Sequence, residues 1–416
     1  MKTKILSVML AASLAVTSFV SLAITASARD LSNITGQYTV MNGEVLTGTI
    51  KYNCWVVVPA GYSVTLRDVT IDGSRWTGTK WAAITVTSGS NGDSSTINLE
   101  GTNTVKGFNE YYPGIFVSPG KTLYIEGSGT LNVSGGDYAP GIGTAYDYDN
   151  DAAVNCGNIV INGGTVNATG GEWAAGIGSG TVSTCGNITI NGGTVNATGG
   201  GFGAGIGSGA GSECGNITIN GGTVTATGGD GAVGIGSGVV GICGNITITD
   251  GVTRVTAVKG GSRTAEGLEV VPNCIGASEQ AEYADWYGYD ATVGTITIGG
   301  DTHVDTGVSP YIYEPVHAVP ATATYAQVGE DYTSSTNDAS KDTASLWRVT
   351  VTPGDTDITS LSVDVNGHRP EAPLSNMANI SGASEVVYGV VINKSGADVT
   401  SFTALVNGEA VDTAHE

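Results

Sequence analysis

The stretch CGNITINGGTVNATGGGFGAGIGSG (residues 185–209) has a close copy on each side of it. CGNIVINGGTVNATGGEWAAGIGSG begins at Cys156 and CGNITINGGTVTATGGDGAVGIGSG begins at Cys214, so the phrase recurs every 29 residues. Self-similarity at a fixed period of this length is the signature of a solenoid, in which each repeat stacks on its neighbours. The repeated phrase therefore decides the fold.

Each repeat holds three short strand-like pieces, which in the quoted copy are residues 188–190, 194–198 and 204–206. Gly-Gly and Gly-Ser pairs separate them, and glycine supplies the positive φ that tight corners require. No repeat contains a stretch long and periodic enough for an amphipathic helix. Three strands and three corners predict one coil of an all-β, right-handed parallel β-helix, in which stacking of the coils creates the core.

The ends of the chain differ from the repeats. Residues 1–28 combine a basic start, an apolar stretch and the small residues Ala26 and Ala28, which predicts a secretory signal peptide. No later stretch reaches the ~18 apolar residues of a spanning helix. We therefore expect a secreted or cell-surface protein without a membrane span.

The predicted β-helix covers residues 29–300, which corresponds to roughly nine coils. Residues 301–345 are expected to be a connecting segment and polar linker. Residues 346–416 contain alternating apolar and polar runs, which predict a small Ig-like β domain of sandwich type. The end at Glu416, soon after a strand, leaves open that this domain is incomplete.

The composition argues against nucleic acid as a partner. The chain has 16 Lys and Arg against 38 Asp and Glu, for a net charge of -22, and residues 122–253 contain no Lys or Arg. Nucleic-acid binding needs a basic surface that displaces counterions from phosphates. The acidity is interpreted as a source of solubility.

Residues one period apart must lie on top of each other in a stacked solenoid. The sequence predicts an inward apolar column, a corner ladder of amide side chains, and a buried column of thiols. Disulfides between neighbouring cysteines of this exported chain are the alternative for the third column. The members are Ile159, Ile188, Ile217 and Ile246; Asn162, Asn191 and Asn220; and Cys156, Cys185, Cys214 and Cys243.

The early coils resemble a known family. WVVVPAGYSVTLRDVTIDG (55–73), STINLEGTNTV (95–105) and KTLYIEGSGTLNVSGG (121–136) are similar to secreted carbohydrate-binding β-helix domains of polysaccharide-degrading bacteria. That family is similar in fold to pectate lyases but is non-catalytic, so the resemblance implies a binding function. Its members commonly place a calcium-associated Asp before a Gly-Ile step. The matching residues here are Pro113, Pro140, Ala175, Ala204 and Val233, which removes support for those calcium sites.

One window of the repeat is free to vary, and it carries aromatic residues four positions before the Gly-Ile isoleucine. We predict that this column binds a carbohydrate, because flat rings stack on sugar rings and the preceding carboxylates accept hydrogen bonds from hydroxyls. The alternative is that the rings stack on one another and shield a corner. The predicted ligand-binding residues are Tyr111, Tyr138, Trp173, Phe202, Asp137 and Glu172.

A second candidate site lies in the insertion YDYDND (146–151). Asp147, Asp149 and Asp151 alternate there, so on an extended loop they would point in one direction and could bind calcium. A solvated acidic loop is the alternative. We expect no other cofactor.

Three functions remain open. The favoured one is a secreted or surface non-enzymatic protein that binds a glycan or glycoprotein. The alternative is a surface adhesin, superantigen-like, that binds a host protein such as immunoglobulin. A calcium-dependent polysaccharide lyase is least favoured, because the central coils lack a basic residue and no paired carboxylates recur.

Overall fold

The computed structural model describes residues 28–50, 53–73, 81–87, 93–147, 152–261, 263–265, 268–270, 272–278, 291–302, 306–316, 320–333, 343–356, 358, 360–365, 387–393 and 401–415. Their regular secondary structure consists of β-strands. The chain divides into two compact units, Met1–Pro315 and Val316–Glu416. The predicted signal peptide falls almost wholly outside the described residues and stays a prediction.

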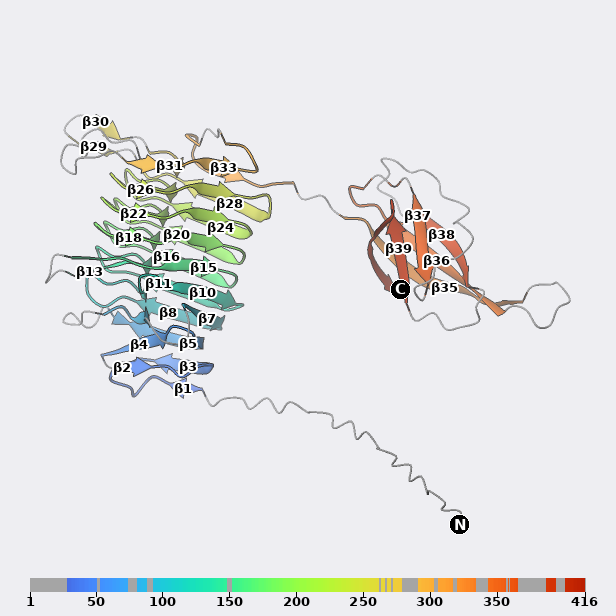
Figure 1. The fold of residues 1–416 in the computed structure, drawn as a ribbon, viewed down its shortest axis with the longest axis horizontal. Coiled ribbons are helices and arrows are strands. Elements are labelled where there is room, and N and C mark those ends of the chain that lie inside the picture. The colour runs from blue at the N-terminus through green and yellow to red at the C-terminus, as the bar shows by residue number, and fades with distance from the viewer. Residues whose placement is uncertain are drawn as a thin grey trace, which may run out of the picture. The chain divides into compact units, whose positions relative to one another are not determined.

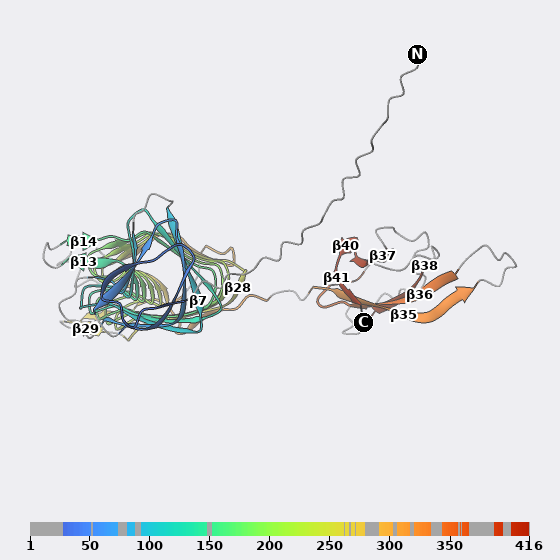
Figure 2. The same cartoon turned by 90° about the horizontal axis from the view of Figure 1, so that it is seen from below.

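The first unit is a parallel β-helix, with its coils stacked in chain order in Figure 1 and seen along the stack in Figure 2. Its largest sheet, sheet A, contains two ladders of strands from successive coils. The first ladder comprises β1 (Arg29–Asp30), β3 (Glu44–Thr49), β5 (Ser63–Asp72), β7 (Ser94–Glu100), β10 (Thr122–Gly127), β15 (Asn158–Ile161), β19 (Ile188–Ile190), β23 (Ile217–Ile219), β27 (Ile246–Ile248) and β33 (Ile296–Ile298).

The second ladder of sheet A branches from β5 and forms the next wall of each coil. It is parallel except for its last pair, in which β34 runs antiparallel to β28. Its strands are β8 (Thr102–Lys106), β11 (Thr130–Ser134), β16 (Thr165–Thr169), β20 (Thr194–Thr198), β24 (Gly222–Thr227), β28 (Val252–Val258) and β34 (Tyr311–Tyr313).

Two further parallel sheets complete the coils. Sheet B has nine strands, one per coil, and sheet C has four. Sheet B comprises β2 (Gly36–Thr39), β4 (Cys54–Pro59), β6 (Ile84–Thr87), β9 (Ile115–Val117), β12 (Ile142–Gly143), β17 (Ile177–Gly178), β21 (Ile206–Gly207), β25 (Ile235–Gly236) and β31 (Ile275–Gly276). Sheet C comprises β18 (Thr184–Cys185), β22 (Glu213–Cys214), β26 (Ile242–Cys243) and β32 (Thr292–Val293).

Two antiparallel hairpins also belong to this unit, and both protrude from the same side of the stack in Figures 1 and 2. They are β13 (Ala145–Asp147) with β14 (Ala152–Val154), and β29 (Arg263–Ala265) with β30 (Leu268–Val270).

The 29-residue period of the sequence is the register of the sheets. Ile188 pairs with Ile217, Ile217 pairs with Ile246, and the side chains of all three are fully buried. The predicted corner ladder also forms, because Asn191 Nδ2 donates to the side-chain oxygen of Asn162 at 2.9 Å and Asn220 repeats this bond to Asn191 at 2.9 Å. The predicted parallel β-helix is confirmed.

The repeated Gly-Ser-Gly phrase has a steric cause at its first glycine. Gly178, Gly207 and Gly236 follow the isoleucines of sheet B and adopt φ values of 135°, 138° and 131°. A Cβ atom on any of them would overlap the carbonyl oxygen of the equivalent glycine in the next coil. Only glycine fits both the conformation and the close approach of the backbones.

The second unit is a small two-sheet β structure, as predicted for the C-terminal part. Buried residues from both sheets, among them Trp347, Val363 and Phe402, form its core. One sheet comprises β35 (Thr322–Thr333), β36 (Thr343–Thr352), β38 (Val387–Asn393) and β41 (Asp412–His415); the other comprises β37 (Leu361–Val365), β39 (Phe402–Val406) and β40 (Glu409–Ala410).

The segment expected as a linker, residues 301–345, contains strands. β34 pairs with β28 in the β-helix, and β35 pairs with β36 and β41 in the second unit. The start of β35 is held by its inward small residues, since Ala321 and Ala323 are buried in the core of that unit. No helix in the described parts of the chain is long and apolar enough to span a bilayer.

Candidate functional site

The variable window lies in the loops that lead from the second ladder of sheet A to sheet B. Backbone hydrogen bonds stack these loops in register: Tyr138 N donates to Glu110 O at 2.8 Å, and Trp173 N donates to Asp137 O at 3.0 Å. Phe202 N continues the series to Glu172 O at 2.9 Å. The structure therefore brings the predicted aromatic residues into one column along an edge of the β-helix.

The rings of this column stack in two pairs. The ring centroids of Tyr111 and Tyr138 are 5.1 Å apart with planes 10° from parallel, and those of Trp173 and Phe202 are 4.1 Å apart with planes 15° from parallel. In each pair, one face of each ring covers the other. The arrangement is the one that the alternative interpretation describes, and sugar binding by these four rings stays a prediction.

Phe202 is buried rather than presented to solvent. Its ring packs with Ala210, Val239 and Val240, and Trp173 packs against this small cluster from the outside. The cluster forms because the loop after each Gly-Ser-Gly phrase returns over the window of the preceding coil, with Val239 N donating to Phe202 O at 3.1 Å. Phe202 thus anchors a corner, while Tyr111, Tyr138 and Trp173 are half-buried.

The carboxylates of the window are exposed. Asp137 and Glu172 lie at the outer rim of the loops. Glu110, one coil before Asp137, and Asp230, two coils after Glu172, are exposed at equivalent positions. Half-buried rings and exposed carboxylates therefore lie side by side along this edge. Such a surface can accept hydrogen bonds from hydroxyl groups.

The predicted calcium ligands fall largely outside the described residues. Asp147 ends β13, where it pairs with Ala152 of β14, but Asp149 and Asp151 and the side chain of Asp147 lie outside the described residues. Calcium binding by this hairpin stays a prediction.

An aromatic pair that the sequence reasoning missed lies near the start of the β-helix. The indole rings of Trp55 and Trp81 stack with centroids 5.3 Å apart and planes 6° from parallel. Trp55 is half-buried against the core, whereas Trp81 is 49% exposed. Among the aromatic residues whose exposure the structure describes, only Trp81 is exposed.

The thiol column forms as predicted. Cys156, Cys185, Cys214 and Cys243 are buried free cysteines that share the core of the β-helix. The Sγ atoms of Cys156 and Cys185 are 2.7 Å apart, and the contacts of Cys185 with its neighbouring thiols raise its pKa well above the usual value. Inward-facing thiols that are buried among apolar side chains act as small packing groups.

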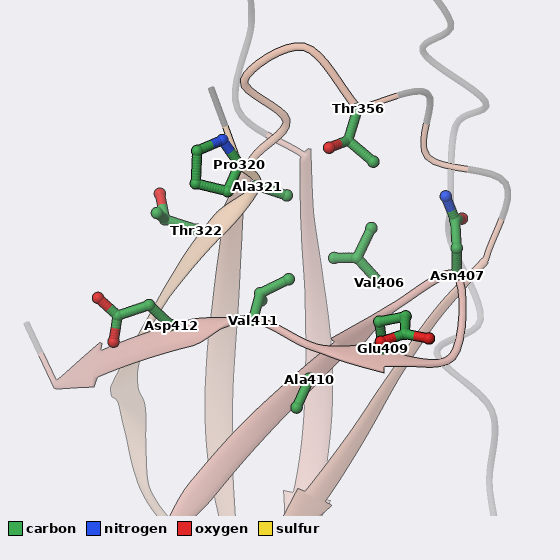
Figure 3. Close-up of a pocket in the computed structure, with 10 residues that line it drawn as sticks. All are labelled: Pro320, Ala321, Thr322, Thr356, Val406, Asn407, Glu409, Ala410, Val411 and Asp412. Atoms are coloured by element: carbon green, nitrogen blue, oxygen red, sulfur yellow. The ribbon is translucent and has the colours of Figure 1, made fainter. Parts of the chain in front are cut away.

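The second unit has an open pocket of about 450 Å³, shown in Figure 3. Val406 and Val411 lie at its centre, and the carboxylates of Glu409 and Asp412 come from the adjoining strands β40 and β41. Both carboxylates are exposed.

Comparison with known proteins supports the architecture of the central coils. A family model described as a β-helix repeat matches residues 159–181, 188–210 and 217–239. Neither a curated protein nor a solved structure matches the chain. The three matched segments are therefore β-helix repeats. The description of the family model names no substrate or partner.

Proposed function

We propose that the protein is a secreted or cell-surface, non-enzymatic protein that binds a carbohydrate through aromatic rings held by the β-helix. The half-exposed indole of Trp81 carries this proposal. An exposed indole suits the apolar C–H face of a sugar ring, and the stacked ring of Trp55 supports it on one side. A ring fixed in this way loses little conformational entropy when a ligand binds.

The aromatic and acidic edge supplies a second set of contacts. The edges of Tyr138 and Trp173 lie beside the exposed carboxylates of Asp137 and Glu172, which can accept hydrogen bonds from sugar hydroxyls. The central coils contain no Lys or Arg, and an acidic surface repels anions. A neutral glycan therefore fits better than an anionic polysaccharide.

The mature protein and its Trp81→Ala variant should be compared on a glycan array and then by calorimetry with a retained glycan. Loss of one stacked ring is worth about 0.5–1.5 kcal/mol, so we expect the affinity to fall about 2- to 12-fold. Trp81→Phe is the matched control, because it keeps a ring at this position and should keep most of the affinity.

The Tyr138→Ala/Trp173→Ala variant tests the edge separately. Unchanged glycan affinity in both alanine variants, or a wild-type protein that retains no glycan, would contradict the proposal. A pull-down from host secretions covers the adhesin alternative: capture of immunoglobulin or another host protein that free sugars do not displace would favour it.

A further inference from the structure

The outer surface of four neighbouring strands, β11, β16, β20 and β24, carries a regular array of small polar side chains. Parallel pairing places equivalent residues of the four strands side by side. All members are exposed or half-buried. We call this surface the Thr/Asn face; its three columns are Thr130, Thr165, Thr194 and Thr223; Asn132, Asn167, Asn196 and Thr225; and Ser134, Thr169, Thr198 and Thr227.

The core holds the strands of this face in place, and hydrogen bonds hold its asparagine side chains. The residues that alternate with it, such as Val195 and Ala197 on β20, are buried in the core. In the middle column, Asn167 Nδ2 donates to Asn132 Oδ1 at 2.8 Å and Asn196 repeats this bond to Asn167 at 2.8 Å. The hydroxyl groups of the face, as far as the structure describes it, are bonded to no other protein group and are available to solvent.

The face has no charge in a strongly acidic chain. The nearest charged side chains in the same columns are Lys106 on β8 and Arg254 on β28, which lie beyond its first and last strands. The face also contains no aromatic ring, so it cannot stack on sugars. A partner of this surface must be neutral and must use regularly spaced hydrogen bonds.

The spacing of the array matches that of an ordered water network. Equivalent side chains on adjacent parallel strands repeat every ~4.8 Å, and successive outward residues on one strand repeat every ~6.6 Å. Two water oxygens that are hydrogen-bonded to a common third at about 2.75 Å, with tetrahedral geometry, lie about 4.5 Å apart. Water molecules bound along a column of hydroxyls therefore lie close to the positions of a tetrahedral lattice.

We propose that the Thr/Asn face binds ice. The hydroxyl and amide groups hold a layer of water in lattice-like positions, and the threonine methyl groups between them limit other arrangements. Because the core fixes the strands and the amide ladder fixes the asparagine side chains, little ordering of the backbone is needed on contact with the crystal. This inference is independent of carbohydrate binding at Trp81.

The test is growth of a single ice crystal in a solution of the mature protein. We expect faceted crystals and a freezing point below the melting point. Thr194→Tyr/Thr198→Tyr should reduce this gap at least tenfold, because the rings protrude from the plane while tyrosine remains favourable in strands. Glu213→Tyr, an exposed substitution on β22 of sheet C, is the matched control and should leave the gap unchanged.

If the tyrosine variant does not fold, Thr194→Val/Thr198→Val removes the two hydroxyls with nearly the same shape and serves the same purpose. Round, unshaped crystals with the wild-type protein, or equal gaps for the wild type and a folded variant, would overturn the proposal. So would sedimentation with crystalline cellulose or chitin that requires Thr194 and Thr198 while ice growth is unaffected, since the face would then be a polysaccharide site.

Discussion

The coils before residue 144 and the coils from 156 to 249 share sheets A and B but stabilise their surfaces differently. The early coils use ion pairs, such as Arg67 with Glu100 at 2.5 Å and Lys121 with Asp93 at 2.7 Å. The regular coils contain no Lys or Arg and use ladders of amides between equivalent asparagines. Exposed ion pairs contribute little to stability. An amide ladder forms only where equivalent asparagines lie above one another, so the stability of the regular coils depends more on their register.

The two regions also differ in whether their aromatic residues pack in the core of a corner or are exposed to solvent. In the regular coils, each residue is constrained by the equivalent residues in the coils above and below it. Phe202 is buried in a small apolar cluster. The early coils vary in length, and this irregularity leaves room for an exposed ring at Trp81. Repetition therefore builds a uniform face, while single departures from the repeat provide separate binding points.

Deletion within the regular coils should give the largest effect. Removing residues 185–213 joins Thr184 to Cys214 and deletes one whole period, so we expect a soluble β-helix that is one coil shorter. Removing residues 185–198 instead shifts every column out of register, and we expect the fold of the coils to be lost. Circular dichroism and gel filtration distinguish the two. Equal damage from both deletions would refute the dependence on register.

Glycine substitutions compare the two regions at single residues. Gly207→Ala combines strain at a φ of 138° with overlap on the next coil, and we expect a loss of about 2–6 kcal/mol in the free energy of unfolding. Gly43, in the early coils, has a φ of 77° and open space where a Cβ would lie, so Gly43→Ala should cost about 1–2 kcal/mol. Denaturant titration measures both, and similar losses would show that the glycine column is not specially constrained.

The columns of the regular coils could be predicted from the sequence because a fixed period places each residue above its equivalent. The inward isoleucines, the Asn162–Asn191–Asn220 ladder and the thiols all follow from this single rule. The pairing of rings in the aromatic window could not be predicted in the same way. It depends on the path of the returning loop that carries Val239 and Val240, and loop paths are not encoded in the period.

The Trp55–Trp81 pair shows the same limit. The two residues are 26 positions apart, whereas β4 pairs with β6 at a separation of 28, as between Val56 and Ile84. The stack therefore forms off register, between Trp55 of β4 and Trp81, which lies outside the strands. The only sequence signal for this pair is the presence of a Trp just before a strand, and that signal does not predict its partner.

The buried cysteines give the smallest expected effect, and one that depends on pH. The native protein should resist alkylation at neutral pH, and unfolding without reduction should make all six cysteines reactive, because they are free and buried. Mass spectrometry after iodoacetamide treatment counts the modified residues. Two or fewer reactive thiols in the unfolded chain would instead establish disulfides, with Cys156–Cys185 and Cys214–Cys243 as the expected pairs.

Cys54, in the early coils, should make the free energy of unfolding depend on pH in alkaline solution. Burial raises its pKa from 9.0 to about 11, so between these values the unfolded chain loses the thiol proton while the folded chain keeps it. The unfolded state then binds fewer protons, and the free energy of unfolding falls as the pH rises. The contribution of this thiol is complete below pH 9 and lost above about pH 11. Cys54→Ala should unfold more easily at pH 7 but lose less stability than the wild type between pH 9 and 11; parallel declines in the two proteins would show that Cys54 does not titrate in this range.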